Sequence, residues 1–226
     1  MMQLMKLSLL PIFLLGIILS SCVKKHEQEE LAQDTLVESL PYYQSADFTP
    51  IWFSDPDSLP ADFHQIPAFS FTNQLGETIS DESMKGQIMV VDFFFTTCPG
   101  ICPKMTDKMK LVQEAFLEEE QVSILSHSVT PDYDQVEVLA EYAERYGVIG
   151  GKWHLLTGDR EKIYDLARNY YFVEEDLGLL KAPDEFLHTE NFVLIDQNRH
   201  IRGIYNGLNS ASVNQLISDI KSLKKS

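Results

Sequence analysis

Residues 88–105 read IMVVDFFFTTCPGICPKM, and this stretch decides the fold class. Its first part, residues 88–95, is a nearly unbroken apolar run rich in β-branched and aromatic side chains, which is typical of a central strand covered on both faces. Cys98 and Cys102 follow this run, and the chain from residue 103 onward has helical periodicity. We therefore expect a buried strand, a loop with two cysteines and a helix in direct succession.

The sequence on both sides of this stretch predicts alternating strands and helices. Strands are expected at 67–71, 77–80, 122–128, 192–196 and 200–205, and helices at 103–117, 134–145, 159–168 and 210–223. Strands separated by helices imply crossover connections, whereas the last two strands form a hairpin, so the sheet should be mixed. This order resembles a thioredoxin-like α/β sandwich, with a mixed central sheet flanked by helices and an N-terminal hairpin.

Composition and charge limit the classes of function. The chain has 226 residues, with 18 Lys and Arg against 34 Asp and Glu, a formal net charge of −16 and a pI of about 4.6. Such a charge repels a phosphate backbone, so nucleic acid is not an expected partner. Three cysteines are too few for a scaffold stapled by disulfides, so the fold must depend on a buried apolar core.

The N-terminal segment predicts export and a lipid anchor. Residues 7–19 form an apolar run that is too short to span a bilayer, which is typical of a signal peptide at 1–21. The run ends in Leu19-Ser20-Ser21-Cys22, which resembles a bacterial lipobox and makes Cys22 the acylated residue; an ordinary secretory signal is the alternative. We expect a flexible acidic tether at 22–47 and a folded domain at 48–226, held at the cell envelope on the extracytoplasmic, periplasmic side.

The two cysteines are expected to be functional. Each precedes a proline, which disfavours the αR conformation, so both should lie in a tight loop. Pro103 suits the first helical position, and Cys102 should then lie at the positive end of the helix dipole, where the thiol pKa falls. A structural disulfide between residues four apart would stabilise little, because short loops restrict the unfolded chain least. A redox disulfide and a soft metal remain as alternatives.

The spacing of the cysteines bears on this choice. Three residues separate them, where a thioredoxin-type redox pair has two, and the wider spacing leaves room for an ion. Two sulfurs need a further ligand from elsewhere, and His188 lies in a polar loop just before the strand at 192–196. In a thioredoxin-like sheet that loop packs beside the cysteine loop. From the residues alone, a solvated loop histidine remains the alternative.

Residues 91–105 resemble the signature of the Sco/SenC family, copper-handling assembly factors for cytochrome c oxidase. The segments 128–134 and 153–158, together with His188, fall in the order and spacing of that family. The resemblance implies a membrane-tethered domain that binds copper, as Cu(I) or Cu(II), through Cys98, Cys102 and His188. It also implies delivery of the metal to the copper-site subunit of cytochrome c oxidase.

Two positions depart from the family pattern. The family often has aspartate where this chain has Leu187 and Thr130. If an aspartate beside the histidine orients its imidazole, that support must come from another group, such as Glu185 or Glu190. The departures leave the ligands unchanged and bear on copper affinity and redox tuning.

The chemistry of the expected ligands favours copper and does not require the methionines. Two thiolates and an imidazole form a soft set that suits copper, whereas structural zinc usually takes four protein ligands. Met105 and Met109 could extend a copper path, but they share a helical stripe with Val112 and Phe116 and are assigned to the core.

Two other classes of function stay open beside the metallochaperone, which is not an enzyme. In the first, Cys98 and Cys102 act as a thiol-disulfide oxidoreductase that reduces the cysteines of the oxidase copper site. In the second, the protein is a copper or redox sensor that binds a partner without delivering metal. The cysteine spacing and the histidine favour the metallochaperone over the oxidoreductase.

Overall fold

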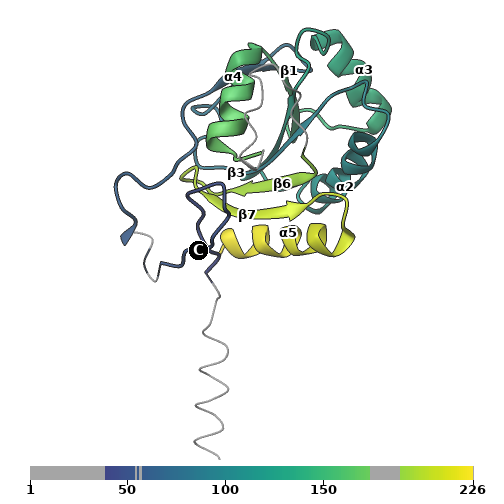
Figure 1. Ribbon diagram of the computed structural model, residues 1–226. Helices are drawn as coiled ribbons and strands as arrows, with labels where there is room; N and C mark the ends of the chain where they lie inside the picture. The colour runs from purple at the N-terminus through teal and green to yellow at the C-terminus, as the bar shows by residue number, and fades with distance from the viewer. Residues whose placement is uncertain (1–38, 54, 56–57, 174–188, 226) are drawn as a thin grey trace, which may run out of the picture. The chain divides into compact units, whose positions relative to one another are not determined.

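The computed structural model describes residues 39–53, 55, 58–173 and 189–225 (Figure 1). Its described residues from Leu40 onward form one compact unit built on a seven-stranded sheet. None of the described helices has the length and apolar character needed to cross a membrane.

The sheet is mixed and has the strand order β2-β1-β5-β4-β3-β6-β7. Its strands are β1 (Ser70–Asn73), β2 (Thr78–Ser80), β3 (Ile88–Phe94), β4 (Val122–Ser128), β5 (Trp153–Thr157), β6 (Asn191–Ile195) and β7 (Ile201–Asn206). The three central strands β3, β4 and β5 run parallel, whereas β6 pairs antiparallel with β3, and β1 with β5. We call the end of the sheet where β3, β4 and β5 terminate the cysteine end, because Cys98 follows β3.

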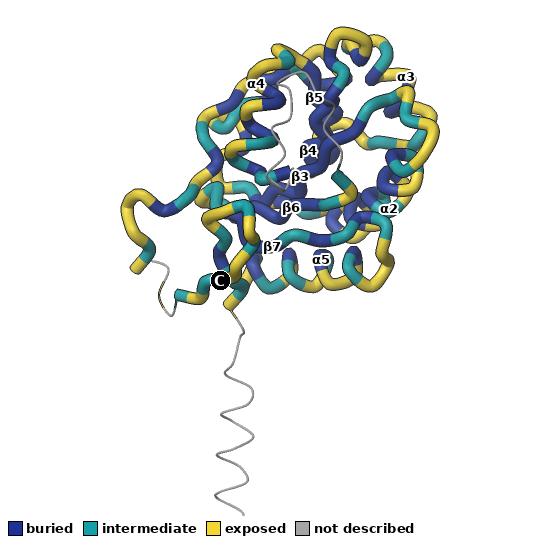
Figure 2. The backbone as a smooth tube through the Cα atoms, viewed as in Figure 1, coloured by how far each residue is buried: buried dark blue, intermediate teal, exposed yellow. Residues whose placement is uncertain are grey.

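Helices cover both faces of the sheet (Figures 1 and 2). They are α2 (Ile101–Ala115), α3 (Val136–Tyr146), α4 (Arg160–Asp165), the π-helix η2 (Leu166–Tyr170) and α5 (Ser210–Leu223). All seven residues of β3 are buried, because Val90 and Phe94 pack with α2, α3 and α5 while Val91 and Phe93 pack with α4 and η2. This two-sided burial explains why residues 88–95 read as a continuous apolar run.

Most of the expected elements are present, and the structure has one further strand, β5. The strand at 122–128 and the helix at 210–223 have the predicted bounds, and β1 and β2 form the expected antiparallel hairpin. Asp159 caps α4 by accepting the Lys162 N–H at 2.9 Å, and Gly147 ends α3 with a φ of 71°. No strand had been assigned to 153–157, where His154 interrupts a short apolar run; β5 is nevertheless buried throughout.

The compact unit begins before residue 48. Residues 40–47, which the sequence analysis assigned to the tether, belong to a segment that packs on the domain, and we call residues 39–53 the strap. Within the strap, Tyr42 pairs with Ile51, and the Tyr43 N–H donates to the Ile201 carbonyl at the start of β7. Because β7 runs antiparallel to β6, and β6 antiparallel to β3, this contact lies at the end of the sheet opposite the cysteine end.

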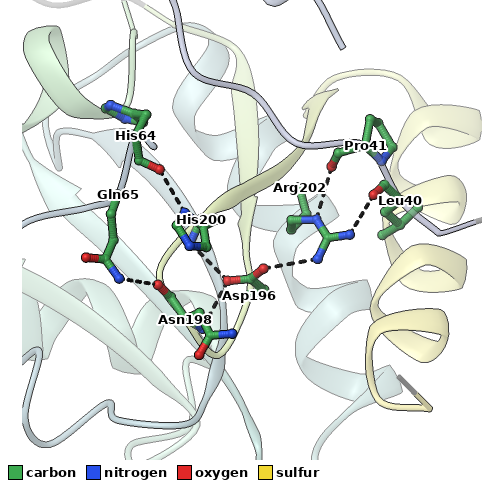
Figure 3. A network of polar contacts seen from close by, with 8 residues as sticks. All are labelled: Leu40, Pro41, His64, Gln65, Asp196, Asn198, His200 and Arg202. Atoms are coloured by element: carbon green, nitrogen blue, oxygen red, sulfur yellow. Dashed lines mark hydrogen bonds and ion pairs between the residues drawn. The ribbon is translucent and has the colours of Figure 1, made fainter. Parts of the chain in front are cut away.

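Arg202 is the residue that holds the strap (Figure 3). Its guanidinium donates to the carbonyl oxygens of Leu40 and Pro41 at 2.5 and 3.0 Å and lies 3.7 Å from the centroid of the Tyr42 ring. The same guanidinium forms a buried ion pair with Asp196 at 3.0 Å. Every charged group in this network therefore has a partner, as buried charges require.

Candidate metal centre

Cys98 and Cys102 lie at the cysteine end of the sheet, on either side of the start of α2. Both thiols are free; Cys98 is partly exposed and Cys102 is buried, with 5% of its surface accessible. They line a common cavity of about 330 Å³ whose other walls are mainly apolar, from Phe93, Phe94, Phe95, Pro99, Ile101 and Val129. The structure therefore brings the two predicted sulfur ligands together in a small, mainly apolar cavity.

The surroundings of Cys98 favour its thiolate. Partial burial raises the pKa of the Cys98 thiol, but hydrogen bonds from the Cys102 side chain and from the backbone N–H groups of Cys102, Gly100 and Ile101 outweigh burial and lower it. These N–H groups belong to the first turn of α2, which has no carbonyl partners for them within the helix. Cys98 is therefore the nucleophilic sulfur of the pair.

The prediction for Cys102 is wrong in two respects. Cys102 lies inside the first turn of α2, which starts at Ile101, so Pro103 is the third helical residue and not the first. Burial, together with the hydrogen bond to Cys98, raises the pKa of the Cys102 thiol to about 12. The helix N-terminus does stabilise a thiolate, but its N–H groups point at Cys98, since the loop folds back over the helix.

A buried carboxyl group lies on the same face of β3 that packs against α2. Asp92 is 3% exposed, and burial raises its pKa to about 7 although a hydrogen bond from Ser126 lowers it. The Trp153 indole N–H donates to the Ser126 hydroxyl at 2.8 Å, and that hydroxyl donates to Asp92. Asp92 is the one charged residue in the apolar run 88–95, and this position could have indicated a buried carboxyl group from the sequence.

A second buried carboxylate braces the cysteine loop. Asp134, in the loop between β4 and α3, accepts hydrogen bonds from the N–H and hydroxyl of Thr96, two residues before Cys98. The hydroxyls of Ser128 and Thr130 donate to the same carboxylate at 2.5 and 3.0 Å. Residues 128–134 are among the segments that resemble the Sco/SenC pattern, but no role was predicted for Asp134.

The third predicted ligand, His188, lies outside the described residues, as do Leu187, Glu185 and the predicted lipidation site Cys22. The next residue in the chain, Thr189, is described and lines the cavity of the two cysteines. Glu190, considered above as support for the imidazole, accepts a hydrogen bond from the Asn206 side chain.

The other described histidines do not join the cysteines. His127 is fully buried, neither ring nitrogen has a hydrogen-bond partner, and burial lowers its pKa to about 3. His154 contacts the Asn73 amide at 3.2 Å, and His64 and His200 lie beside the strap network. Within the part of the chain that the structure describes, no three His, Cys, Asp or Glu side chains form a metal cluster. Met105 and Met109 are buried in the core, as expected.

The SCO1/SenC family model matches residues 58–225. The chain belongs to the SCO1/SenC family. The SCO1 protein homolog of Bacillus subtilis is 32% identical over 164 residues, which are 70% of this chain and 82% of that protein.

Solved structures of the SCO1/SenC family share the fold. A SCO1/SenC family lipoprotein from Bacillus anthracis is 32% identical, with a TM-score of 0.62 over 71% of this chain and 95% of that one. BsSco, described as having a disulfide switch and as a member of the Sco family of cytochrome c oxidase assembly proteins, is also 32% identical, with a TM-score of 0.61 over 72% and 94%. These neighbours confirm the predicted thioredoxin-like α/β sandwich.

More distant SCO1/SenC structures show the fold alone. ScoI of Bradyrhizobium japonicum, solved with copper bound, is 22% identical, with a TM-score of 0.55 over 69% of this chain and 96% of that one. In this chain, the hydroxyl of Thr130, one of the two departures noted in the sequence, donates to the buried Asp134 carboxylate.

Proposed function

We propose that this protein is a copper metallochaperone that assists assembly of cytochrome c oxidase and holds copper through Cys98, Cys102 and His188. The observation that carries the proposal is the shared cavity. Two free thiols line it together with Thr189, the residue that follows His188 in the chain. The proposed set of two sulfurs and one imidazole is completed if His188, the residue before Thr189, supplies the imidazole.

The chemistry of the donor set supports copper as the cargo. Thiolates and imidazole are soft or intermediate donors that suit copper, whereas Mg²⁺ and Ca²⁺ prefer oxygen ligands. Cys98 already favours its thiolate, so it is suited to make the first bond, and Cys102 must give up its proton as it becomes the second ligand. The partly exposed Cys98 leaves room for an incoming ligand of the recipient, which suits transfer by ligand exchange.

The recipient and the location form part of the proposal. BsSco belongs to a family of cytochrome c oxidase assembly proteins, and we extend this role to the present chain, with the copper-site subunit of the oxidase as recipient. A signal peptide at 1–21 and acylation at Cys22 would hold the domain at the membrane on the extracytoplasmic side. The B. anthracis relative, described as a lipoprotein, supports this arrangement.

A thiol-disulfide oxidoreductase is the second candidate function, and the asymmetry of the two cysteines favours it. A nucleophilic, partly exposed sulfur at Cys98 beside a buried, protonated thiol at Cys102 is the arrangement needed to attack a partner disulfide and then resolve the mixed disulfide. Copper and a disulfide compete for the same sulfurs. Catalytic reduction of a partner disulfide by the reduced, metal-free protein would support this second function.

Copper binding by the full mature chain in detergent tests the proposed function. We expect one copper per chain and a thiolate-to-copper charge-transfer band in the wild type. Cys98→Ser, Cys102→Ser and His188→Ala should each lower the affinity by orders of magnitude, because each removes one of three ligands. The matched control is His26→Ala, which removes a histidine upstream of the strap and should leave the band unchanged. Full copper affinity in His188→Ala would refute the three-ligand site.

A further inference from the structure

Asp134 is a buried carboxylate that is satisfied entirely by neutral donors. It is 0% exposed and accepts from the Thr96 N–H at 3.2 Å, from the Ser128 and Thr130 hydroxyls at 2.5 and 3.0 Å, and from the Thr96 hydroxyl. No Lys, Arg or His among the described residues forms an ion pair with it. Burying such a charge without a cation is costly, and only a complete set of hydrogen bonds compensates for it.

The donors to Asp134 come from two directions. Ser128 and Thr130 belong to the end of β4 and the loop beyond it, on the same side of the network as Asp134 itself. Thr96 comes from the other side, in the segment that joins the end of β3 to Cys98. The carboxylate therefore ties the end of β4 to the cysteine loop at the point where that loop leaves the sheet.

The contact with Thr96 is transmitted to Cys98 through one turn. The Cys98 N–H donates to the Phe95 carbonyl at 3.3 Å, so residues 95–98 form a turn with Thr96 inside it. Cys98, at the end of this turn, lines the cavity that it shares with Cys102 and the first residues of α2. The direction in which the turn leaves β3 decides where in this cavity the sulfur lies.

We infer that Asp134 is a positioning residue for the metal centre: through Thr96 it holds the 95–98 turn so that Cys98 lines the cavity beside Cys102. This role deepens the proposed function, since it concerns the sulfur that makes the first bond to copper. It also rests on contacts that exist without metal, so it can be tested in the metal-free protein.

The test compares variants inside and outside the network in the full mature chain. Thr96→Val removes the hydroxyl that faces the cysteine turn, and Asp134→Asn replaces the carboxylate by an amide. The matched control is Ser123→Ala, which removes a buried hydroxyl that donates to Gln87 near the start of β4, at the end of the sheet opposite the cysteine end. The first readout is the rate at which a neutral alkylating reagent modifies Cys98 at pH 7 in the reduced, metal-free protein. The second is the charge-transfer band after copper loading, and thermal unfolding reports the stability of each variant.

We expect Thr96→Val and Asp134→Asn to slow the modification of Cys98 by about threefold or more, because a turn that Asp134 no longer holds lets the sulfur move from its position in the cavity. Both variants should shift the charge-transfer band. Ser123→Ala should keep the wild-type rate and band even where it loses as much thermal stability.

Three results would overturn the inference. They are an unchanged or faster rate in Thr96→Val, the same slowing in Ser123→Ala as in Thr96→Val, and no rescue in Thr96→Ser, which keeps the hydroxyl. If Asp134→Asn does not fold, the comparison of Thr96→Val with Thr96→Ser still tests the inference. A wild type that binds no copper refutes the proposed function, but the modification rates still test the role of Asp134.

Discussion

Cys98 and Cys102 share one cavity but differ in what surrounds their sulfur atoms. Backbone N–H groups of α2 lower the pKa of the Cys98 thiol, whereas burial raises that of Cys102 to about 12. At neutral pH the free protein therefore keeps a proton on Cys102. Any process that uses both sulfurs, whether metal binding or disulfide formation, must release that proton.

Copper affinity should consequently rise with pH. Below pH 12 the Cys102 proton must be displaced on binding, so the apparent Cu(I) affinity should increase at least about tenfold per pH unit between pH 7 and 9. Competition with a chromogenic Cu(I) chelator over this range measures the slope. Cys102→Ser serves as the control and should bind more weakly with a shallower slope. A wild-type affinity independent of pH would show that Cys102 is not a ligand.

Asp92 should make the protein less stable as the pH rises. Its folded pKa of about 7 lies above the ordinary value of 3.8, so the folded protein holds a proton that the unfolded chain releases between these values. Asp92→Asn mimics the protonated form. The difference in unfolding free energy between this variant and the wild type should grow by up to about 1.4 kcal/mol per pH unit from pH 4 to 7.

Urea unfolding at pH 4, 5.5 and 8 measures that difference. Asp107→Asn, a substitution of an exposed aspartate on α2, is the matched control and should show no such growth. A constant difference between Asp92→Asn and the wild type across this range would contradict the prediction.

His127 should act in the opposite direction. Burial lowers its pKa to about 3, below the ordinary 6.5, so its contribution to stability is complete above pH 6.5 and is lost as the pH falls toward 3. Its ring stacks on Phe93 at 5.2 Å and both nitrogens lack partners, so His127→Phe should stabilise by about 1–3 kcal/mol at pH 8 and by more at pH 5.

Denaturant unfolding of His127→Phe checks this, with His154→Phe as the matched control. His154 is also buried, but its ring contacts the Asn73 amide, so that substitution should destabilise. The contributions of Asp92 and His127 have opposite slopes between about pH 4 and 6.5 and partly offset each other. Burial also lowers the pKa values of His64 and His154, which adds to the slope of His127. Loss of stability in His127→Phe at pH 8 would show that its ring nitrogens have partners.

At the scale of elements, α3 and α2 offer a comparison of two glycines at helix ends. Gly147 ends α3 with a φ of 71°, which strains any other residue, whereas Gly100 precedes α2 with a φ of −114° and open space around its Cα. Gly147→Ala should cost about 1 kcal/mol of unfolding free energy, and Gly100→Ala should cost much less. Chemical denaturation measures both, and equal costs would show that the left-handed conformation does not set the penalty.

The elements also show how far sequence reasoning reaches. The strand at 122–128 and the helix at 210–223 were predicted with the observed bounds. The helix has an apolar face that recurs with the helical period, and the strand is a seven-residue segment that is buried throughout. β5 was missed because its burial depends on β1 and β4 on either side, which a short local window does not contain. The thiolate was assigned to Cys102 for a related reason. The dipole argument identifies a helix N-terminus, but the path of the preceding loop determines which sulfur the N–H groups meet.

At the scale of the whole molecule, the strap should depend on Arg202. Arg202→Lys cannot keep both carbonyl contacts and the ion pair with Asp196, so it should cost about 3–5 kcal/mol and expose the strap to limited proteolysis. Arg199→Lys is the matched control, because the ion pair of Arg199 with Asp81 is partly exposed and is worth about 1 kcal/mol or less. A strap that resists protease equally in both variants would show that Arg202 does not hold it.

The place where Arg202 holds the strap also determines how far the cysteines can travel from an N-terminal anchor. The seven residues of β3 span about 23 Å from the strap side to the cysteine side. For a chain anchored at Cys22, as proposed, the anchored segment would join the domain this far from the cysteine loop. A copper acceptor could then meet the sulfurs without contacting that junction.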